Sequence, residues 1–332
     1  MKHLLLLLAL IIGATAQGQY VPDILGEGFE QLTIDQGEAY DGAAVATLVR
    51  HTPLEDVSRA ALYIHGYNDY FFQREMAEQF IDHAWQFYAL DLRRYGRSLR
   101  EWQRPSDLRQ VDEYFADIDA AVAQMHSEGI DEIILVAHST GGLTTSLYCD
   151  QYADNMPFSA LILNSPFFDM NLGGGLYEGV GVPIVSGFGA IFRNCKVQGA
   201  SDEVGGYARS LSSQYDGEWE FDPALKTLTS LPITAGWIRA IHKGHKRLQR
   251  GLQIPCPVLV MYSDNSVWGN YSADYMRGDS VLDVADIDKY ADNIGQNVTE
   301  VVVEGGMHDL VLSSPEVRYA LYDLIFEWLE DL

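Results

Sequence analysis

Short apolar segments alternate with amphipathic segments along most of the chain. Mostly apolar runs of this length, bounded by turn residues, predict buried strands. A run that is apolar throughout is typical of a strand covered on both faces. The predicted strands lie at residues 43–49, 60–64, 87–91, 132–137, 159–163, 257–262 and 299–303.

Helical periodicity separates several of these runs. Between Leu108 and Met125 the apolar residues recur at intervals of three and four, which predicts one buried helix face. Ser106 or Asp107 can cap the start of this helix, and Gly129 ends it. Residues 315–332 form a second amphipathic pattern. Strands that alternate with helices predict an α/β fold with a mostly parallel sheet and helices on both of its faces.

One long segment interrupts this alternation. About 80 residues separate Phe168 from Gly251, where a crossover between parallel strands needs about a dozen. The segment opens with several glycines, continues with an apolar run and ends in a basic helical stretch. An insertion of this size predicts a sub-domain that caps the core. The predicted core comprises residues 17–168 and 252–332, and the predicted cap or lid comprises residues 169–251.

The N-terminus has the pattern of a signal peptide. Nine apolar residues from Leu4 to Ile12 precede Ala14-Thr15-Ala16, which fits the small-residue cleavage rule. Nine residues are too few for a helix to cross about 30 Å of hydrocarbon. We therefore predict a signal peptide at residues 1–16, cleavage after Ala16 and a secreted or periplasmic protein. No other stretch suggests an integral membrane span.

The net charge of the chain argues against partners that are themselves strongly negative. The 332 residues include 22 Lys and Arg against 47 Asp and Glu, which gives a net charge of −25. Binding to a phosphate backbone depends on basic residues, so we expect no nucleic-acid partner and no anionic-lipid dock. The five basic residues between Arg239 and Arg250 are interpreted as a solvated helix face.

The cysteine count is small and odd. Cys149, Cys195 and Cys256 cannot form a disulfide scaffold. One bridge is allowed in an oxidising compartment, but the sequence does not indicate which pair would form it. We expect three buried thiols.

The strand that ends at Ala137 leads into His138-Ser139-Thr140-Gly141-Gly142 and then into a helical run. A serine on a sharp turn between strand and helix is typical of a nucleophile elbow. Small residues are needed two positions before and two after the serine, because the two backbones nearly touch there. Ala137 and Gly141 meet this need, although the usual first glycine is an alanine. Ser139 is therefore the predicted nucleophile.

A serine hydroxyl needs a base, and the base needs an acid that orients it. In this elbow context the order along the chain is serine, acid, histidine. His308 follows the last predicted strand and is the predicted base. For the acid we favour Asp279, because it precedes one residue and then two apolar residues that start a helix. Asp264, directly after the strand at 257–262, remains the alternative.

An acyl-transfer site also needs hydrogen-bond donors for the developing oxyanion. We predict the backbone N–H of Thr140, which follows the nucleophile, and that of Tyr67, in the loop after the strand at 60–64. Gly66 allows a tight backbone in that loop. No metal and no organic cofactor are expected. His242 and His245 could supply two ligands of a metal site, but the sequence indicates no third ligand.

Four motifs support a resemblance to a known superfamily. The segments 65–72, 88–98, 137–141 and 305–309 resemble those of α/β-hydrolases, in the branch of monoglyceride lipase-like and serine aminopeptidase S33-type enzymes, which includes bacterial lysophospholipase-like proteins. The resemblance spans roughly residues 43–330. It implies the α/β-hydrolase fold with an inserted cap, and it implies Ser139 and His308 as catalytic residues.

The expected function is a secreted serine hydrolase that cleaves monoacylglycerol-like or lysophospholipid-like carboxylic esters, so its partner is a small-molecule ester or lipid. One alternative is a serine aminopeptidase on short peptides. A second alternative is a silent binding module, since a fold alone does not give function; the intact nucleophile, base and oxyanion loop argue against it. In the aminopeptidase, acids of the insertion would hold the peptide's amino terminus: Asp202, Glu203, Glu218, Glu220 and Asp222.

Overall fold

A computed structural model describes residues 18–170 and 180–332. The predicted signal peptide and residues 171–179 of the predicted cap lie outside these residues. In the described chain, nine strands form one sheet in the order β1-β2-β3-β5-β4-β6-β7-β10-β11. Their bounds are Val21–Pro22 (β1), Phe29–Ala39 (β2), Gly42–His51 (β3), Arg59–Ile64 (β4), Gln86–Asp91 (β5), Glu132–His138 (β6), Ala160–Asn164 (β7), Val258–Ser263 (β10) and Val298–Val303 (β11).

The sheet is parallel from β5 to β11 and antiparallel at its other end. Strands β4, β5, β6, β7, β10 and β11 pair in parallel, whereas β1, β2 and β3 join as antiparallel strands. Parallel strands place their carboxyl ends along one edge, where the loops that follow them meet. This arrangement confirms the predicted mostly parallel sheet.

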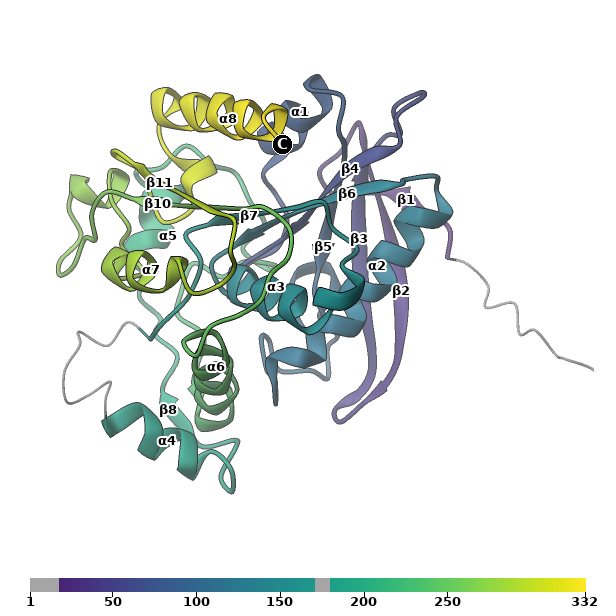
Figure 1. The fold of residues 1–332 in the computed structure, drawn as a ribbon. Helices are drawn as coiled ribbons and strands as arrows, with labels where there is room; N and C mark the ends of the chain where they lie inside the picture. Colours follow the sequence, from purple (N-terminus) through teal and green to yellow (C-terminus); the bar gives the residue numbers. More distant parts are fainter. Residues whose placement is uncertain (1–17, 171–179) are drawn as a thin grey trace, which may run out of the picture.

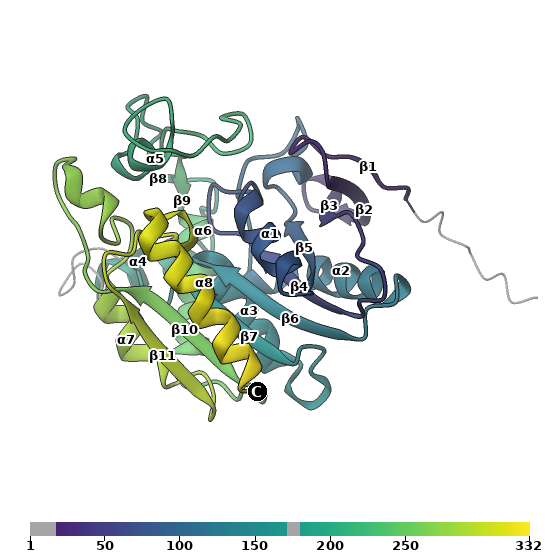
Figure 2. The same ribbon diagram turned by 90° about the horizontal axis from the view of Figure 1, so that it is seen from above.

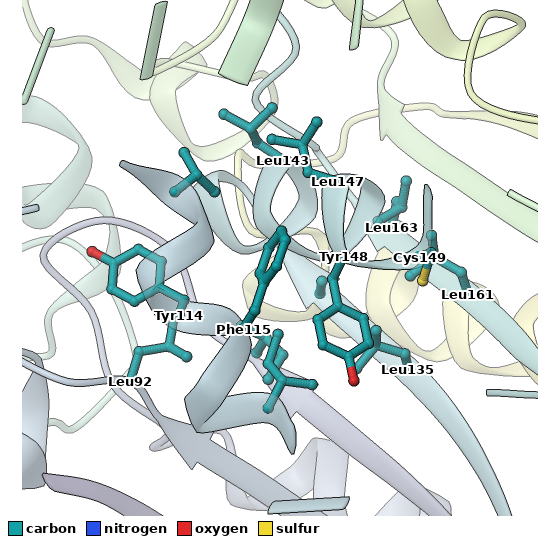
Figure 3. Packing of buried hydrophobic residues seen from close by; sticks show 14 of the residues in the cluster. Leu92, Tyr114, Phe115, Leu135, Leu143, Leu147, Tyr148, Cys149, Leu161 and Leu163 are labelled. Carbon is teal, nitrogen blue, oxygen red and sulfur yellow. The ribbon is translucent and has the colours of Figure 1, made fainter. Parts of the chain in front are cut away.

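Helices cover both faces of the sheet, as predicted. Helices α1 (Arg74–Asp82) and α8 (Pro315–Glu330) lie on one face, and α2 (Phe115–Ser127), α3 (Thr140–Gln151) and α7 (Val284–Ala291) lie on the other (Figures 1 and 2). Each face has its own apolar core. Figure 3 shows leucines of β6 and β7 meeting Phe115 and Tyr148 in one of them. No described helix has the length and apolar character needed to cross a bilayer.

Each of the seven predicted strands coincides with an observed strand. The start predicted for the helix after residue 106 is wrong, because Ser106 has a φ of 56° and a 3₁₀ turn comes before α2. A Gln110–Glu113 capping box begins that turn. The 3₁₀ turns in the described chain span Gly96–Ser98, Val111–Tyr114, Ala153–Asn155, Ala273–Met276 and Leu310–Leu312.

The chain between β7 and β10 forms a separate layer at the carboxyl edge of the sheet. Helices α4 and α6 pack together there, and strands β8 and β9 pair with each other rather than with the central sheet. Figure 1 shows α4 beside α6 at the end of the molecule opposite α8. The elements of this insertion are α4 (Val182–Phe188), β8 (Lys196–Gln198), α5 (Gly206–Leu211), β9 (Ile233–Thr234) and α6 (Ala235–Leu248).

A buried ion pair attaches the insertion to the core. Lys226 of the insertion places Nζ 2.7 Å from Oδ1 of Asp69, and both side chains are almost fully buried. Next to this pair, Asn68 exchanges hydrogen bonds with the backbone of Thr227. Removing one partner of a buried ion pair lowers the stability of the fold strongly, because the other charge stays buried without compensation.

The three cysteines are free thiols. Cys149 and Cys256 are buried, and burial raises the pKa of both thiols, that of Cys256 to about 11. Cys195 is exposed, so the prediction of three buried thiols is wrong for this residue. It lies in the insertion, just before β8.

Replacing Lys226 by methionine should test the buried attachment. The change removes the charge and leaves Asp69 buried without its partner. We expect the free energy of unfolding, measured by urea denaturation, to fall by about 3–5 kcal/mol. Arg209→Met is the matched control, because the Arg209–Asp216 pair is exposed and its loss should lower the stability far less. Equal losses in the two variants would contradict a structural role for the buried pair.

Candidate active site

Ser139 lies at the turn between β6 and α3 in a strained backbone conformation. Its φ is 54° and its ψ is −119°, which is unusual for a residue with a side chain. The turn is closely packed. A Cβ atom on Gly141 would lie 2.5 Å from the carbonyl oxygen of His65 and 2.6 Å from that of Ile64. Only glycine fits at this point, so the spacing between Ser139 and Gly141 follows from the approach of two backbones.

His308 meets Ser139 from the other half of the core. It follows β11, and its Nε2 lies 3.1 Å from Oγ of Ser139. Hydrogen bonds from the Met307 amide to Ser313 Oγ and from the Leu310 amide to Asn164 Oδ1 hold the histidine loop. The imidazole is almost fully buried, so its geometry is fixed by protein groups.

Asp279 contacts the other nitrogen of the imidazole. Its Oδ2 lies 2.8 Å from His308 Nδ1, and its Oδ1 accepts hydrogen bonds from the amides of Val281 and Leu282. The carboxylate is fully buried. With Asp279 accepting at Nδ1, the neutral imidazole carries its proton there and leaves Nε2 free to accept from Ser139.

The loop that carries Asp279 leaves the sheet at β10 and returns to it. The Asp279 amide donates to the Asn265 carbonyl, and the Val267 amide donates to the Asp279 carbonyl. This pairing brings residue 279 back beside the end of β10. Asp264 lies at the same strand end but accepts a hydrogen bond from the Gly305 amide. The structure therefore brings Asp279, and not the alternative Asp264, to the histidine.

Tyr67 and Thr140, the two residues predicted for the oxyanion hole, lie near Ser139. The loop after β4 lies against the nucleophile, since a Cβ on Gly66 would be 3.0 Å from Cβ of Ser139. The amides of Tyr67 and Thr140 donate to no other described residue. Tyr67 and Thr140 also line a cavity together with Ser139. The two residues predicted for the oxyanion hole are thus brought to the same place.

Behind the histidine lies a buried polar cluster that the sequence analysis did not find. His138 lies between two carboxylates, with Nδ1 3.6 Å from Asp69 Oδ2 and 3.9 Å from Asp309 Oδ2. Its ring centroid is 4.8 Å from that of His308. Burial lowers the pKa of His138, but the carboxylates of Asp309 and Asp69 outweigh burial and raise it. Burial raises the pKa of Asp69, but the Lys226 ammonium together with His138 and His65 outweighs burial and holds that pKa well below its usual value.

The same cluster is a group of described side chains that could hold a metal ion. The ligand atoms of Asp69, His138 and Asp309 lie within 4.8 Å of one another. Lys226, however, already supplies a positive charge to Asp69. The His242–His245 pair offers less, because Nε2 of buried His245 bonds to the Phe167 carbonyl.

Two cavities meet at Ser139. The first has a volume of about 520 Å³ and is mainly apolar, with α4 and α6 forming part of its wall. The second has a volume of about 270 Å³ and reaches the polar cluster and His308. Residues of the insertion line both cavities, so the insertion shapes the space on either side of the nucleophile. The apolar wall includes Phe167, Met170, Val182, Val185, Trp237 and Ile238.

Solved structures with a similar fold include two lipases. A soluble variant of monoglyceride lipase from Saccharomyces cerevisiae is 16% identical, covers 90% of this chain and 96% of its own, and has a TM-score of 0.65. The monoacylglycerol lipase of Paleococcus ferrophilus is 17% identical, covers 82% of this chain and 96% of its own, and has a TM-score of 0.59. At these identities the likeness shows the α/β-hydrolase fold.

A sequence relative matches a smaller part of the chain. The rat (Rattus norvegicus) protein named prolyl endopeptidase-like is 26% identical over 144 residues, which are 41% of this chain and 20% of the relative. The chain thus aligns with about a fifth of that protein's length.

The family comparison covers much more of the sequence. The family model described as serine aminopeptidase, S33 matches residues 56–315, which is more than half of the chain. The match begins just before β4 and ends at the first residue of α8, so it includes the insertion and the segments that carry Ser139, Asp279 and His308. The chain therefore belongs to the S33 serine aminopeptidase family of α/β-hydrolases.

Proposed function

We propose that this protein is a serine hydrolase that cleaves carboxylic esters with an apolar acyl chain, through an acyl-enzyme on Ser139. The observation that carries this proposal is the apolar cavity that opens onto a serine within hydrogen-bond distance of a histidine. A nucleophile beside a base that is itself oriented by a third group is the arrangement that acyl transfer requires.

In the proposed mechanism His308 Nε2 takes the proton of Ser139 as Oγ attacks the ester carbonyl carbon. The oxyanion that forms is stabilised by the amides of Tyr67 and Thr140, and each such donor is worth about 3 kcal/mol of barrier. His308 then gives the proton to the leaving alcohol, and Asp279 stabilises the imidazolium between the two transfers. Water, activated by the same histidine, releases the acid from Ser139.

The two cavities would suit an ester that combines an apolar acyl chain with a polar alcohol. An acyl chain fits the larger cavity, where aliphatic and aromatic side chains of α4 and α6 meet the core. The leaving alcohol would lie toward the smaller cavity, beside His138 and Lys226. Monoacylglycerols and lysophospholipids combine these two properties. The names of the two similar lipases agree with this substrate class.

The second candidate function is that of an aminopeptidase, because the matching family is described as serine aminopeptidase, S33. The acids considered for holding a peptide's amino terminus do not support it, because none of Asp202, Glu203, Glu218, Glu220 and Asp222 lines either cavity at Ser139. We expect kcat/KM for a medium-chain p-nitrophenyl ester to exceed that for proline p-nitroanilide by orders of magnitude. Faster turnover of the anilide would favour the aminopeptidase.

Labelling by a fluorophosphonate probe tests the proposed triad. We expect wild-type protein to be labelled and Ser139→Ala to take no label. Asp279→Asn should label about 10⁴-fold more slowly, because the imidazole loses the acceptor that fixes its tautomer. Asp264→Asn is the matched control and should label nearly as fast as wild type, since Asp264 bonds to a backbone amide elsewhere. Comparable rates for the two Asp variants would contradict the assignment of the acid.

Filling the apolar cavity tests the proposed acyl site. Val185 lines this cavity from α4, so Val185→Phe should obstruct a long acyl chain. We expect kcat/KM for p-nitrophenyl decanoate to fall about tenfold or more, with p-nitrophenyl acetate changed much less. Val302→Phe, on an exposed position of β11, is the control. A parallel loss on both esters in the Val185 variant would place the acyl chain elsewhere.

A further inference from the structure

One segment of the insertion contacts the core loop that carries Tyr67, a proposed oxyanion donor. Residues 221–227 lie between α5 and β9 and form no helix or strand. We call this segment the strap. Its hydrogen bonds reach three successive residues of the loop after β4, which are Asn68, Asp69 and Tyr70. The insertion therefore holds one short stretch of the core at three neighbouring points.

The strap itself is a turn with its own hydrogen bonds. The Ala224 amide donates to Oδ1 of Asp222 at 2.8 Å, and the Lys226 amide donates to the carbonyl of Asp222. A side-chain bond of this kind to the backbone two residues on is typical of aspartate at the start of a turn. Just before the strap, Nε1 of Trp219 donates to the Leu312 carbonyl at 2.8 Å. The strap is thus anchored to the core on the side away from Tyr67 as well.

Asn68 makes the most specific contact with the strap. Its Nδ2 donates to the carbonyl of Thr227 at 2.9 Å, and its Oδ1 accepts from the amide of Thr227 at 3.2 Å. The φ of Asn68 is 50°, a left-handed conformation that is unfavourable for most residues with a side chain. Asparagine tolerates this conformation better than most. The bonds with Thr227 stabilise the loop in a conformation that would otherwise be disfavoured.

The Tyr67 amide lies between two fixed points of the chain. On one side Gly66 packs against the nucleophile, where a Cβ would lie 3.0 Å from Cβ of Ser139. On the other side Asn68 is bonded to the strap. Because each peptide unit is planar, the direction of the Tyr67 N–H depends on the dihedral angles of its neighbours. Losing the hold on Asn68 would free one of these two points.

We propose that Asn68 is a positioning residue, through which the strap of the insertion holds the Tyr67 amide in place for the developing oxyanion. This inference rests on the proposed function, which gives that amide its role. Donors stabilise an oxyanion efficiently only when they are fixed before the reaction begins. A misplacement of about 1 Å can cost about 100-fold in rate. The insertion thus contributes to the chemistry as well as to the walls of the cavities.

Replacing Asn68 by glycine tests this inference. Glycine adopts a positive φ without strain, so Asn68→Gly removes the contacts with Thr227 and leaves the backbone conformation accessible. We expect kcat/KM for p-nitrophenyl acetate to fall about tenfold or more. Asp56→Gly, at an exposed left-handed position elsewhere, is the matched control and should keep the wild-type value. Asn68→Asp keeps the shape but loses the donor to the Thr227 carbonyl. It should also lower kcat/KM, and it replaces the glycine variant if that variant unfolds in urea more easily than Asp56→Gly.

A thionoester substrate separates positioning of the amide from damage to the rest of the site. Sulfur accepts hydrogen bonds more weakly than oxygen, so wild-type protein should prefer p-nitrophenyl acetate to its thiono analogue. In Asn68→Gly this preference should shrink by about the factor by which kcat/KM for the ester falls. A displaced Ser139 or His308 would slow both substrates equally. An equal loss on both substrates, or no preference in the wild type, would overturn the inference.

Labelling by a fluorophosphonate probe distinguishes failure of this inference from failure of the proposed function. The probe needs the nucleophile and the oxyanion donors but no particular ester. Wild-type protein that takes the label but hydrolyses neither ester would overturn the proposed function alone, and slower labelling of Asn68→Gly than of Asp56→Gly would still support positioning. Labelling and ester hydrolysis at wild-type rates in Asn68→Gly would overturn the positioning role alone.

Discussion

The close approach of α3 to the end of β4 is the constraint on which the site depends. At Gly141 there is no room for a Cβ beside the carbonyls of Ile64 and His65. This contact limits where α3 can begin, and the strained turn at Ser139 connects β6 to a helix in that position. The same contact holds the loop of Gly66 and Tyr67 against the serine. One steric requirement thus positions the nucleophile and the amides beside it together.

Patterns that act over a short stretch of chain were readable from the sequence. The seven apolar strands, the elbow at Ser139 and the histidine after the last strand were all predicted, because each is bounded by local signals. Strand β2, which lies between the short edge strand β1 and β3, was missed. Only Phe29 and Leu32 of Phe29–Ala39 are buried, and the other residues are partly or fully exposed. Such a strand shows no continuous apolar run. The helix after residue 106 was predicted to start too early because a 3₁₀ turn continues the same spacing.

Long-range pairings could not be predicted in the same way. The choice between Asp264 and Asp279 depends on backbone hydrogen bonds that fold one loop back on itself. The polar cluster joins residues 69, 138, 226 and 309. These residues lie far apart along the chain, and no local pattern links them. In each case the missing information was the arrangement of segments in space.

The loop of Asp279 shows how this enzyme family could vary without losing its chemistry. Hydrogen bonds from Asp279 to Asn265 and from Val267 to Asp279 close the loop at its base. The stretch from Trp268 to Arg277 lies beyond these hydrogen bonds. Its tip carries no part of the link to the histidine. Insertions, deletions or a grafted recognition element could therefore accumulate at the tip during evolution while the carboxylate stayed in register. The number of residues between β10 and Asp279 could therefore change without moving the carboxylate away from His308.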